Sequence, residues 1–338
     1  MVHIHGSEYP HSLAWVNACG AGNTAVSIQG LSSVCAGFYL GGISRRELVK
    51  SVTLRDLMRR DTLFAQQRRM KARGRYEREL FSKVGHVIGR TAWDRAHAWA
   101  MNPEARYHFL HPTLREPFYR SEWDAGACEK HTIFLSQSHY PLKGLHMVAE
   151  ALPLVLRHYP DARVHVAGPD ILSVPAWRRN GYAHYLGKLM ERLGVRDRFR
   201  WLGRLSAEQM CSQFRKAHIF VCPSMIENES NSLGEAQMVG TPCIAAYAGG
   251  MMDSVSHGET GFLYQGYLFI FPSQTGGDEE VYIQRILCMG VNKLSVFGVI
   301  LQSGTDATPH GCFRLRINAV VSRTHRGEVN KSTLCRLL

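Results

Sequence analysis

Short apolar runs alternate with helix-like segments through most of the chain, and this alternation restricts the fold more than any other feature of the sequence. It is most regular over residues 131–264, where five runs predict strands separated by four predicted helices. The predicted strands are HTIFLSQS, ARVHVAGPD, RFRWLGRL, HIFVCPS and TPCIAAY. Strands that alternate with helices are typical of a parallel sheet with helices on its faces. Residues 131–264 are therefore expected to form an α/β domain.

The first 110 residues follow the same order less regularly. Strands are predicted at VHIHG, NTAVSIQG, HVIG and ARYHFLHP, and residues 44–85 predict one long helix with Ser44 as its N-cap. Residues 111–130 hold proline, glycine and charges with no steady period, which indicates a linker between domains. The 338 residues suffice for two domains, at 1–110 and 131–264. Residues 265–338 stay unassigned, because strand-like and helix-like segments no longer alternate there.

The chain is basic, with 40 lysines and arginines against 28 acidic residues and a net charge of +12, so anionic partners are expected. Between Arg59 and Arg78, eight basic residues stand against Asp61 and Glu77. Such a helix is either an ordinary solvated face or an interfacial helix on an anionic membrane surface. Nucleic acid is not expected as a partner, because no aromatic-rich RNA signature or recognition helix accompanies the charge.

Nine scattered cysteines contain no C-x-x-C or Cys/His spacing, so no metal site is expected and the thiols are interpreted as reduced. No signal peptide and no run of eighteen apolar residues is present. We therefore expect a cytoplasmic protein, with a peripheral position on the inner face of the membrane if the basic helix binds lipid.

Three carboxylates lie close together in SMIENESNSLGEAQMVGTP, directly after the buried strand HIFVCPS. The loop therefore lies at the carboxyl edge of a parallel sheet, where α/β folds bind ligands. Asn231 or Ser232 can cap the next helix, whose N–H groups and dipole favour a diphosphate. Glu235 can accept hydrogen bonds from ribose hydroxyls, and Glu227 would face the next group of that ligand. Alternatively, Glu227 and Glu229 are solvated loop acids and Glu235 is a first-turn dipole residue.

Several segments together resemble one family. Glu227 and Glu235 form an E-x7-E pattern, and GTPCIAAYAGGMMDSVSHGETGFLY follows it. Upstream, SQSHYPLKGLHMVAEALPLV, VHVAGPD and FRWLGRLSAEQM lie in the matching order, and a looser likeness extends to residue 1. The chain resembles retaining glycosyltransferases of the GT-B fold, family 4, of the bacterial surface-polysaccharide type. The resemblance implies two Rossmann-like parallel-sheet domains that face each other across a cleft, the first of them incomplete.

The resemblance also implies an activity and residue roles. A hexosyltransferase of this kind moves a sugar from a nucleotide-sugar donor to a glycan or lipid-linked acceptor with retention of configuration, and needs no metal or other cofactor. By resemblance Glu235 binds the ribose, Glu227 contacts the donor sugar and Lys143 neutralises the diphosphate. The helix start, at Asn231, Ser232 and Leu233, completes the donor site.

Four further positions are candidates with two interpretations each. Gly249 and Gly250 let the backbone approach the nucleotide, or simply form a turn. His5, at the end of a strand, lines the cleft as a catalytic candidate, or is structural. Arg90 binds an anion in the cleft, or makes a surface ion pair.

The sequence departs from the family pattern in two places. Ser138 stands where the family usually has an arginine five residues before Lys143, so one cationic contact to the diphosphate is missing or replaced. Asn228 and Ser230 stand where glycines normally separate the two acids, which puts backbone contacts in doubt.

The two ends of the chain do not resemble the family. Its first domain normally begins before the VHIHG strand, and residues 265–338 do not match its closing helices. A truncated or frame-altered member is therefore expected, with an exposed sheet edge in the first domain. Two rival functions remain open: a catalytically silent nucleotide-sugar-binding protein, and a nucleotide-sugar epimerase of the GT-B fold.

Overall fold

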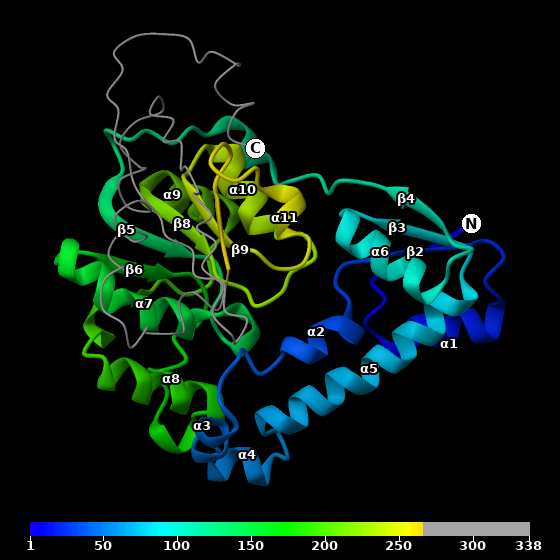
Figure 1. The fold of residues 1–338 in the computed structure, drawn as a ribbon, viewed down its shortest axis with the longest axis horizontal. Helices are drawn as coiled ribbons and strands as arrows, with labels where there is room; N and C mark the ends of the chain where they lie inside the picture. The colour runs from blue at the N-terminus through cyan, green and yellow to red at the C-terminus, as the bar shows by residue number, and fades with distance from the viewer. Residues whose placement is uncertain (266–338) are drawn as a thin grey trace, which may run out of the picture. The chain divides into compact units, whose positions relative to one another are not determined.

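The computed structural model describes residues 1–265, so the predicted unassigned tail lies outside the described residues from 266 onward. Two parallel sheets organise these residues (Figure 1). The predicted α/β class is confirmed. We call residues 1–110 the first lobe and residues 111–265 the second lobe.

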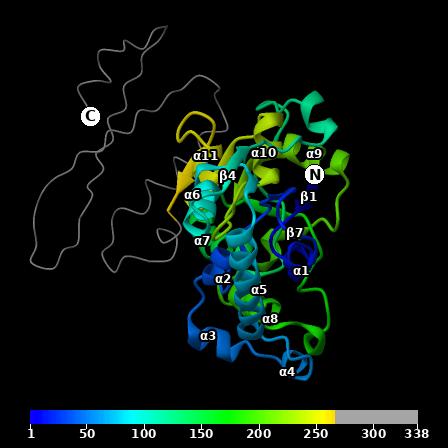
Figure 2. The ribbon, with the colours of Figure 1, turned by 90° about the vertical axis from the view of Figure 1, so that its right-hand side faces the viewer.

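The first lobe is built on a four-stranded parallel sheet. Its strands, in spatial order, are β1 (Val2–His5), β2 (Thr24–Ser27), β3 (His86–Gly89) and β4 (Arg106–Phe109). Its helices are α1 (Pro10–Cys19), α2 (Ser32–Phe38), α5 (Leu63–Lys83) and α6 (Ala92–Met101). The 21-residue α5 packs against α1, α2 and α6 (Figures 1 and 2). Val26, Leu80 and Phe81 are central to the core that these elements enclose.

Residues 44–85 do not form the single helix predicted from the sequence. They form α3 (Arg45–Lys50), α4 (Leu54–Met58) and α5. Ser44 caps α3 as predicted, since its Oγ accepts the Glu47 N–H at 3.3 Å. The helix is interrupted because Thr53 and Thr62 each cap a new one with a side-chain hydroxyl. Threonine side chains that bond the backbone compete with helix continuation in this way.

The second lobe contains a six-stranded parallel sheet in the order β10-β9-β8-β5-β6-β7. The strands are β5 (Glu129–Leu135), β6 (Arg163–Val166), β7 (Phe199–Trp201), β8 (Ala217–Cys222), β9 (Cys243–Ala246) and β10 (Phe262–Tyr264). The five predicted strands are present, and β10 is an addition. The chain runs outward from β5 to β7 and then returns to β8 on the other side. The carboxyl ends of β5 and β8 therefore form a topological switch point, where a crevice opens between diverging loops.

Helices connect these strands by the crossovers that parallel pairing requires. They are α7 (Leu145–His158), α8 (Gly181–Arg192), α9 (Ala207–Lys216), α10 (Asn231–Val239) and the short α11 (Met251–Ser254). Ser206 caps α9 in a capping box with Gln209. Right-handed crossovers place α7 and α8 on one face of the sheet and α9 and α10 on the other (Figure 1). Phe134, Phe214 and Phe220 meet edge-on or tilted in the core.

The predicted linker is shorter than residues 111–130. It contains the 3₁₀ helix η1 (Glu116–Arg120), whose Phe118 is fully buried in the core of the second lobe. The Trp123 indole donates to the Ala217 carbonyl at 2.7 Å, so this side chain is also part of that lobe. Large aromatic side chains with a satisfied polar group belong to a packed interior, and the second lobe therefore begins before residue 131.

The first lobe also contributes to the core of the second. Ile43, Leu48 and Leu63 belong to the same buried cluster as the β5–β9 residues. In addition, the His146 ring on α7 bonds the Gly41 carbonyl at 2.8 Å, and Thr53 Oγ1 donates to the Arg179 carbonyl at 3.1 Å. The segment from the end of α2 to the start of α5 therefore joins the two lobes.

Candidate functional site

The loops after β5 and β8 contact each other at the switch point. The first loop continues into the 3₁₀ turn η2 (Pro141–Lys143) and then Gly144, which has φ +72° and starts α7. A Cβ atom on Gly144 would overlap the Pro223 carbonyl oxygen in the loop after β8. Glycine at this position therefore permits the close approach of the two loops, and this approach sets Lys143 beside Glu227.

Lys143 and Glu227 form an ion pair that is largely shielded from solvent. The Ser224 hydroxyl also donates to Glu227 Oε1, at 2.9 Å. Burial opposes the lysine charge, but the Glu227 carboxylate and Tyr140 outweigh it and hold the pKa of Lys143 above its usual value. Lys143 is therefore a permanently charged cation at neutral pH.

This ion pair lines a cavity of about 200 Å³, which we call the switch-point cavity. Its wall combines the loops after β5 and β8, the start of α10, and two residues of the first lobe, Gln29 and Arg90. The predicted site residues that line it are Lys143, Glu227, Asn231, Ser232 and Arg90. Residues more than 200 positions apart in the sequence thus converge on one polar cavity.

The sequence allowed two roles for Arg90, anion binding in the cleft or a surface ion pair, and the structure combines parts of both. Its Nη2 donates to Gln29 Oε1 at 2.7 Å, and its Nε lies 3.9 Å from Glu229 Oε2. The side chain is mostly buried and lines the cavity. Arg90 is therefore an interior cation at the cavity wall, and its ion pair is not on the surface.

Glu229 has a role that the sequence interpretation missed, since it was taken as a solvated acid. The structure buries it between Arg90 and His111, whose Nδ1 lies 3.5 Å from Glu229 Oε1. Burial raises the pKa of Glu229, although Arg90 and the hydrogen bond with the His111 ring oppose the shift. No sequence pattern could have revealed this, because both neighbours come from residues far upstream.

The cap of α10 lies one position earlier than predicted. Ser230 Oγ accepts the Leu233 N–H at 3.4 Å, so neither Asn231 nor Ser232 is the N-cap. Leu233 itself is fully buried in the core. Asn231 and Ser232 are the first helical residues and line the switch-point cavity. The helix start therefore still contributes to the cavity, through these two positions.

Asn228 and Ser230, which stand in place of the usual glycines, both have structural roles. Thr91 at the start of α6 donates its hydroxyl to Asn228 Oδ1 at 2.8 Å, and both side chains are buried. Ser230 supplies the α10 cap. We call residues 223–230, between β8 and α10, the acidic loop. Asn228 bonds this loop to the first lobe, and Ser230 bonds it to its own helix.

Gly249 and Gly250 contact the acidic loop and are not among the residues that line the switch-point cavity. A Cβ on Gly249 would overlap the Glu227 carbonyl oxygen, and one on Gly250 would overlap that of Asn228. The Gly250 N–H donates to the Glu227 carbonyl at 2.9 Å. This pair of glycines therefore supports the backbone that carries the carboxylates.

Glu235 lies one helical turn beyond the cavity and is bound to a residue that the sequence did not indicate. Its two carboxylate oxygens accept hydrogen bonds from Arg115 Nε and Nη2, both at 2.9 Å. The residue is 4% exposed, and burial raises its pKa although Arg115 opposes the shift. Glu235 is not among the residues that line the switch-point cavity.

His5 and Ser138 also lie off the cavity wall. His5 is exposed, and its Nδ1 lies 3.3 Å from Gln29 Nε2. Ser138 is fully buried, and its hydroxyl has no hydrogen-bond partner in the described part of the chain. Neither residue supplies charge to the cavity, so the cations on its wall are Lys143 and Arg90.

Comparison with known proteins identifies the part of the chain that carries this site. Residues 121–268 match the family model of glycosyl transferases group 1. This segment belongs to that family. The predicted glycosyltransferase family is therefore confirmed for residues 121–268, and the switch-point cavity lies mainly within this group 1 glycosyltransferase segment.

Curated relatives support this assignment over the same region. The D-inositol 3-phosphate glycosyltransferase of Streptomyces scabiei is 35% identical over 127 residues, which cover 38% of this chain and 28% of the relative. The enzyme of the same name from Corynebacterium glutamicum is 34% identical over 130 residues, covering 38% and 29%. The chain thus spans less than a third of the length of these curated relatives.

Solved structures confirm the fold of the group 1 glycosyltransferase segment and its neighbouring lobe. Sucrose-phosphate synthase from Thermosynechococcus elongatus aligns with a TM-score of 0.60 at 17% identity, covering 85% of this chain and 64% of that one. Anabaena HepE in complex with UDP-glucose aligns with a TM-score of 0.54 at 16% identity, covering 86% and 72%. Both support the GT-B fold, and at these identities the likeness concerns the fold alone.

Residues 1–265 also bear on two kinds of partner, metal ions and the membrane. No group of three or more His, Cys, Asp or Glu side chains in this part of the chain could hold a metal ion. Within the same residues, no helix is long and apolar enough to cross a membrane. That transfer needs no metal stays a prediction.

Proposed function

We propose that this chain transfers a hexosyl group from a nucleotide-sugar donor to an acceptor hydroxyl, with retention of configuration and without a metal. The proposal depends on one observation: a shielded Lys143–Glu227 pair lies beside the start of α10, at the switch point of a group 1 glycosyltransferase segment. This is where open α/β sheets bind their ligands.

The donor diphosphate would bind to Lys143 and the α10 start. A helix N-terminus offers N–H groups and a positive dipole end to an anion, and Lys143 adds a full charge. Arg90 would supply the second cation, which Ser138 cannot, because Arg90 lines the same cavity. The solved structures of Anabaena HepE in complex with UDP-glucose and of S. aureus TarM in complex with UDP are consistent with such a ligand.

Chemistry at the sugar requires that the leaving diphosphate be stabilised as its bond to the anomeric carbon breaks. Fixed cations and N–H groups stabilise the departing charge more than they stabilise the bound donor. Glu227 would contact the donor sugar, where a carboxylate favours the positive charge that develops on the ring. Glu227 and Lys143 therefore act on opposite charges of one transition state.

Glu235 would bind the ribose hydroxyls, in keeping with the resemblance. The carboxylate is held by Arg115 through both oxygens, so ribose binding requires Arg115 to give up at least one of these bonds. Arg115 is half exposed and can move into solvent more readily than the buried Glu235.

The acceptor is proposed to be a glycan or a lipid-linked glycan, at the cytoplasmic face of a membrane. The curated relatives are named for D-inositol 3-phosphate, which is also a polyhydroxyl compound. All eight basic residues between Arg59 and Arg78 are exposed, as a surface that meets anionic lipid requires. A membrane contact would bring a lipid-linked acceptor close to the enzyme.

A donor panel tests this function. The full chain is mixed with UDP-, GDP- and ADP-sugars, and hydrolysis or transfer is followed by mass spectrometry, with the anomeric configuration of the product read by NMR. Release of nucleoside diphosphate with a retained anomeric centre supports the proposal. Calorimetric binding without turnover would instead indicate a silent binding protein, and inversion at C2 of the free nucleotide-sugar would indicate an epimerase.

A further inference from the structure

Helix α4 presents apolar side chains to solvent. Leu54 is 74% exposed, Leu57 is 60% exposed and Met58 is 78% exposed. Its single buried residue is the polar Asp56. The usual arrangement of a surface helix, with apolar residues inward, is therefore reversed in α4.

Local hydrogen bonds fix this reversed orientation. Asp56 bonds the Thr53 N–H and the Arg55 guanidinium, at 3.4 and 3.1 Å, while the Thr53 hydroxyl caps the helix. The same hydroxyl donates to the Arg179 carbonyl of the second lobe at 3.1 Å. The apolar side of α4 is thus held outward by bonds on its polar side.

A tryptophan from the second lobe joins this exposed apolar surface. The 3₁₀ turn η3 (Ala176–Arg178) contacts α4, and its Trp177 is 75% exposed. The Arg178 guanidinium lies 5.3 Å from the centre of the Trp177 ring. Tryptophan is the side chain most favoured where apolar and polar media meet. We call Leu54, Leu57, Met58 and Trp177 the apolar tip.

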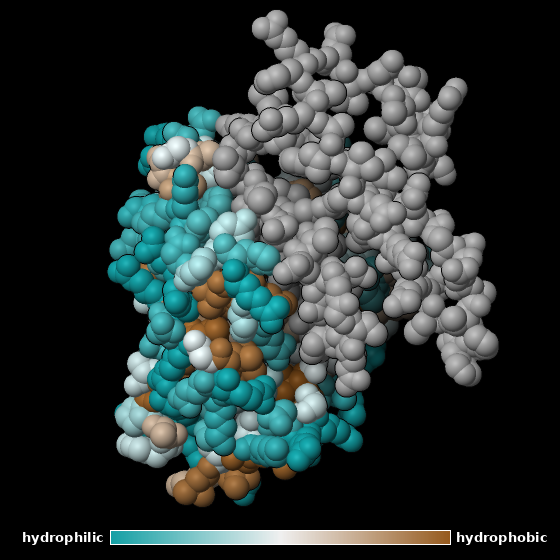
Figure 3. Space-filling view, turned by 60° about the vertical axis from the view of Figure 1, so that its left-hand side comes forward, coloured by the Kyte–Doolittle hydropathy of each residue, from teal (hydrophilic) through white to brown (hydrophobic). Residues whose placement is uncertain are grey.

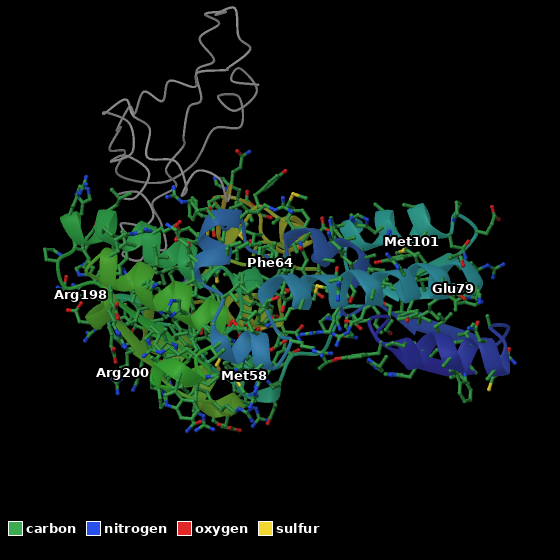
Figure 4. All side chains as sticks on the ribbon, turned by 90° about the horizontal axis from the view of Figure 1, so that it is seen from below. Met58, Phe64, Glu79, Met101, Arg198 and Arg200 are labelled. Carbon is green, nitrogen blue, oxygen red and sulfur yellow. The ribbon has the colours of Figure 1, made fainter. Side chains whose placement is uncertain are left out.

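Figures 3 and 4 show the region of the tip. Apolar atoms gather at the lower end of the face drawn in Figure 3, the level at which Figure 1 places α4. Figure 4 views the molecule from below and labels Met58. The tip is small, so it suits partial insertion and not an extended protein interface.

Positive charge surrounds the apolar tip. Arg59 and Arg60 follow α4 directly and are exposed, as is Arg178. Residues 44–83 contain thirteen basic and five acidic residues, and two of the acids, Asp56 and Glu77, are buried. An exposed apolar group ringed by arginines is complementary to a bilayer with anionic headgroups. A protein partner would need acidic residues around an apolar pocket, and nothing in the structure suggests that geometry.

We propose that the apolar tip inserts into the interface of an anionic bilayer, while the surrounding arginines bind its headgroups. This goes beyond the proposed membrane contact of the basic helix, because it assigns insertion to α4 and η3, on two different lobes. Donor binding and turnover are not needed for it, so it can fail or succeed independently of the proposed enzyme activity.

Vesicle co-sedimentation of the full chain tests the proposal. We expect binding to vesicles of phosphatidylcholine with phosphatidylglycerol, and far weaker binding to phosphatidylcholine alone. Leu57→Gln combined with Met58→Gln should lower the partition coefficient by roughly tenfold. Arg59→Gln combined with Arg60→Gln should lower binding to the anionic vesicles only. Leu110→Gln is the matched control, because Leu110 is 59% exposed but lies after β4, and it should bind as the unmodified chain does.

Tryptophan fluorescence provides a second measurement. Vesicle addition should shift the emission to shorter wavelength, and Trp177→Phe should abolish that shift, whereas Trp99→Phe on α6 should retain it. Equal binding by all variants would overturn the proposal, as would equal binding to uncharged vesicles. Self-association that Leu57→Gln abolishes, with no vesicle binding, would also overturn it and assign the tip to a second copy of the chain. Unchanged melting temperatures would show that the variants are folded.

Discussion

Lys143 and Glu227 hold opposite charges in one shielded cavity, and the proposed transition state uses both. Lys143→Met removes the cation while keeping the length of the side chain. We expect the transfer rate to fall by about a hundred- to a thousandfold, the usual loss when one fixed donor to a leaving group is removed. The measurement is steady-state release of nucleoside diphosphate.

The matched control for this change is Lys216→Met, at the exposed end of α9. It removes the same charge from the surface and should leave the rate unaltered. A Lys143→Met variant that retains most of its activity would exclude Lys143 from leaving-group stabilisation.

The Arg115–Glu235 pair allows a test of the proposed ribose-binding role of Glu235. If Glu235 binds ribose, Glu235→Ala should weaken nucleoside diphosphate binding by on the order of 1.5–3 kcal/mol, the value of a hydrogen bond to a charged group. Arg115→Ala should strengthen binding, because it frees the carboxylate from its present partner. Isothermal titration calorimetry on both variants checks this.

The two outcomes separate the roles of the pair. If both changes weaken binding equally, Glu235 acts by anchoring the Arg115 segment and not by contacting the ligand. The double variant shows whether the two effects are coupled.

Capping residues determine where one helix ends and the next begins, and the capping residue Thr53 also contacts the second lobe. Its hydroxyl accepts the Asp56 N–H at 3.2 Å and donates to the Arg179 carbonyl of the other lobe. Thr53→Ala should lower the free energy of unfolding by about 2 kcal/mol, roughly half from the cap and half from the second bond. Thr62→Ala, which removes a cap alone, should cost about 1 kcal/mol. Urea denaturation measures both, and equal losses would mean that the bond between lobes adds no stability.

The glycines behind the acidic loop give a test at the level of the loop. Gly249→Ala combines a φ of +64° with a collision against the Glu227 carbonyl. Gly258→Ala shares a positive φ, +85°, with nothing nearby, so it should cost only about 1–2 kcal/mol. We expect Gly249→Ala to cost more and also to weaken donor binding, as measured by thermal melts and calorimetry. If the two variants behave alike, the collision is relieved and the loop does not need this glycine.

The sequence predicted the elements of the second lobe well, because each strand is a compact apolar run with a clear turn at either end. It failed over residues 44–85, where Thr53 and Thr62 interrupt a helical pattern that has no proline or glycine at these breaks. Local side-chain bonds of this kind are weak signals in a sequence.

Within the site, sequence reasoning reached Lys143 and Glu227, on two loops of the second lobe, and Arg90, after β3 of the first lobe. Lys143 and Glu227 each follow a recognisable strand. Glu229 and Arg115 were missed because their roles depend on partners about 140 and 120 positions away. The apolar tip was invisible for the same reason, since Trp177 and α4 come together only in the folded chain.

The whole molecule should lose stability in mild acid through His146. Its Nε2 donates to the Gly41 carbonyl, and in the neutral ring Nδ1 accepts from the Tyr182 hydroxyl. Burial lowers the pKa of His146 to about 4, from an ordinary value of 6.5. The unfolded chain therefore binds this proton first, and stability present above about pH 6.5 is lost as the pH falls toward 4.

The lowered pKa of His146 corresponds to a loss of about 3 kcal/mol in the free energy of unfolding over this pH range. The difference in free energy of unfolding between the unmodified chain and His146→Gln, measured by urea titration from pH 7 to pH 4, isolates it from other groups. We expect His146→Gln to be less stable at pH 7 and to show a shallower decline. Parallel curves would mean that His146 is not a neutral buried group.

One hydrogen bond connects the proposed donor site to the other lobe. Thr91 donates a hydrogen bond to Asn228, the residue next to Glu227, so the position of the Glu227 carboxylate depends on the separation of the lobes. Thermodynamic linkage between the two ligands is reciprocal. If nucleotide-sugar binding favours approach of the lobes, an acceptor that draws the lobes together must raise the affinity for the nucleotide-sugar, and the nucleotide-sugar must raise the affinity for that acceptor by the same factor.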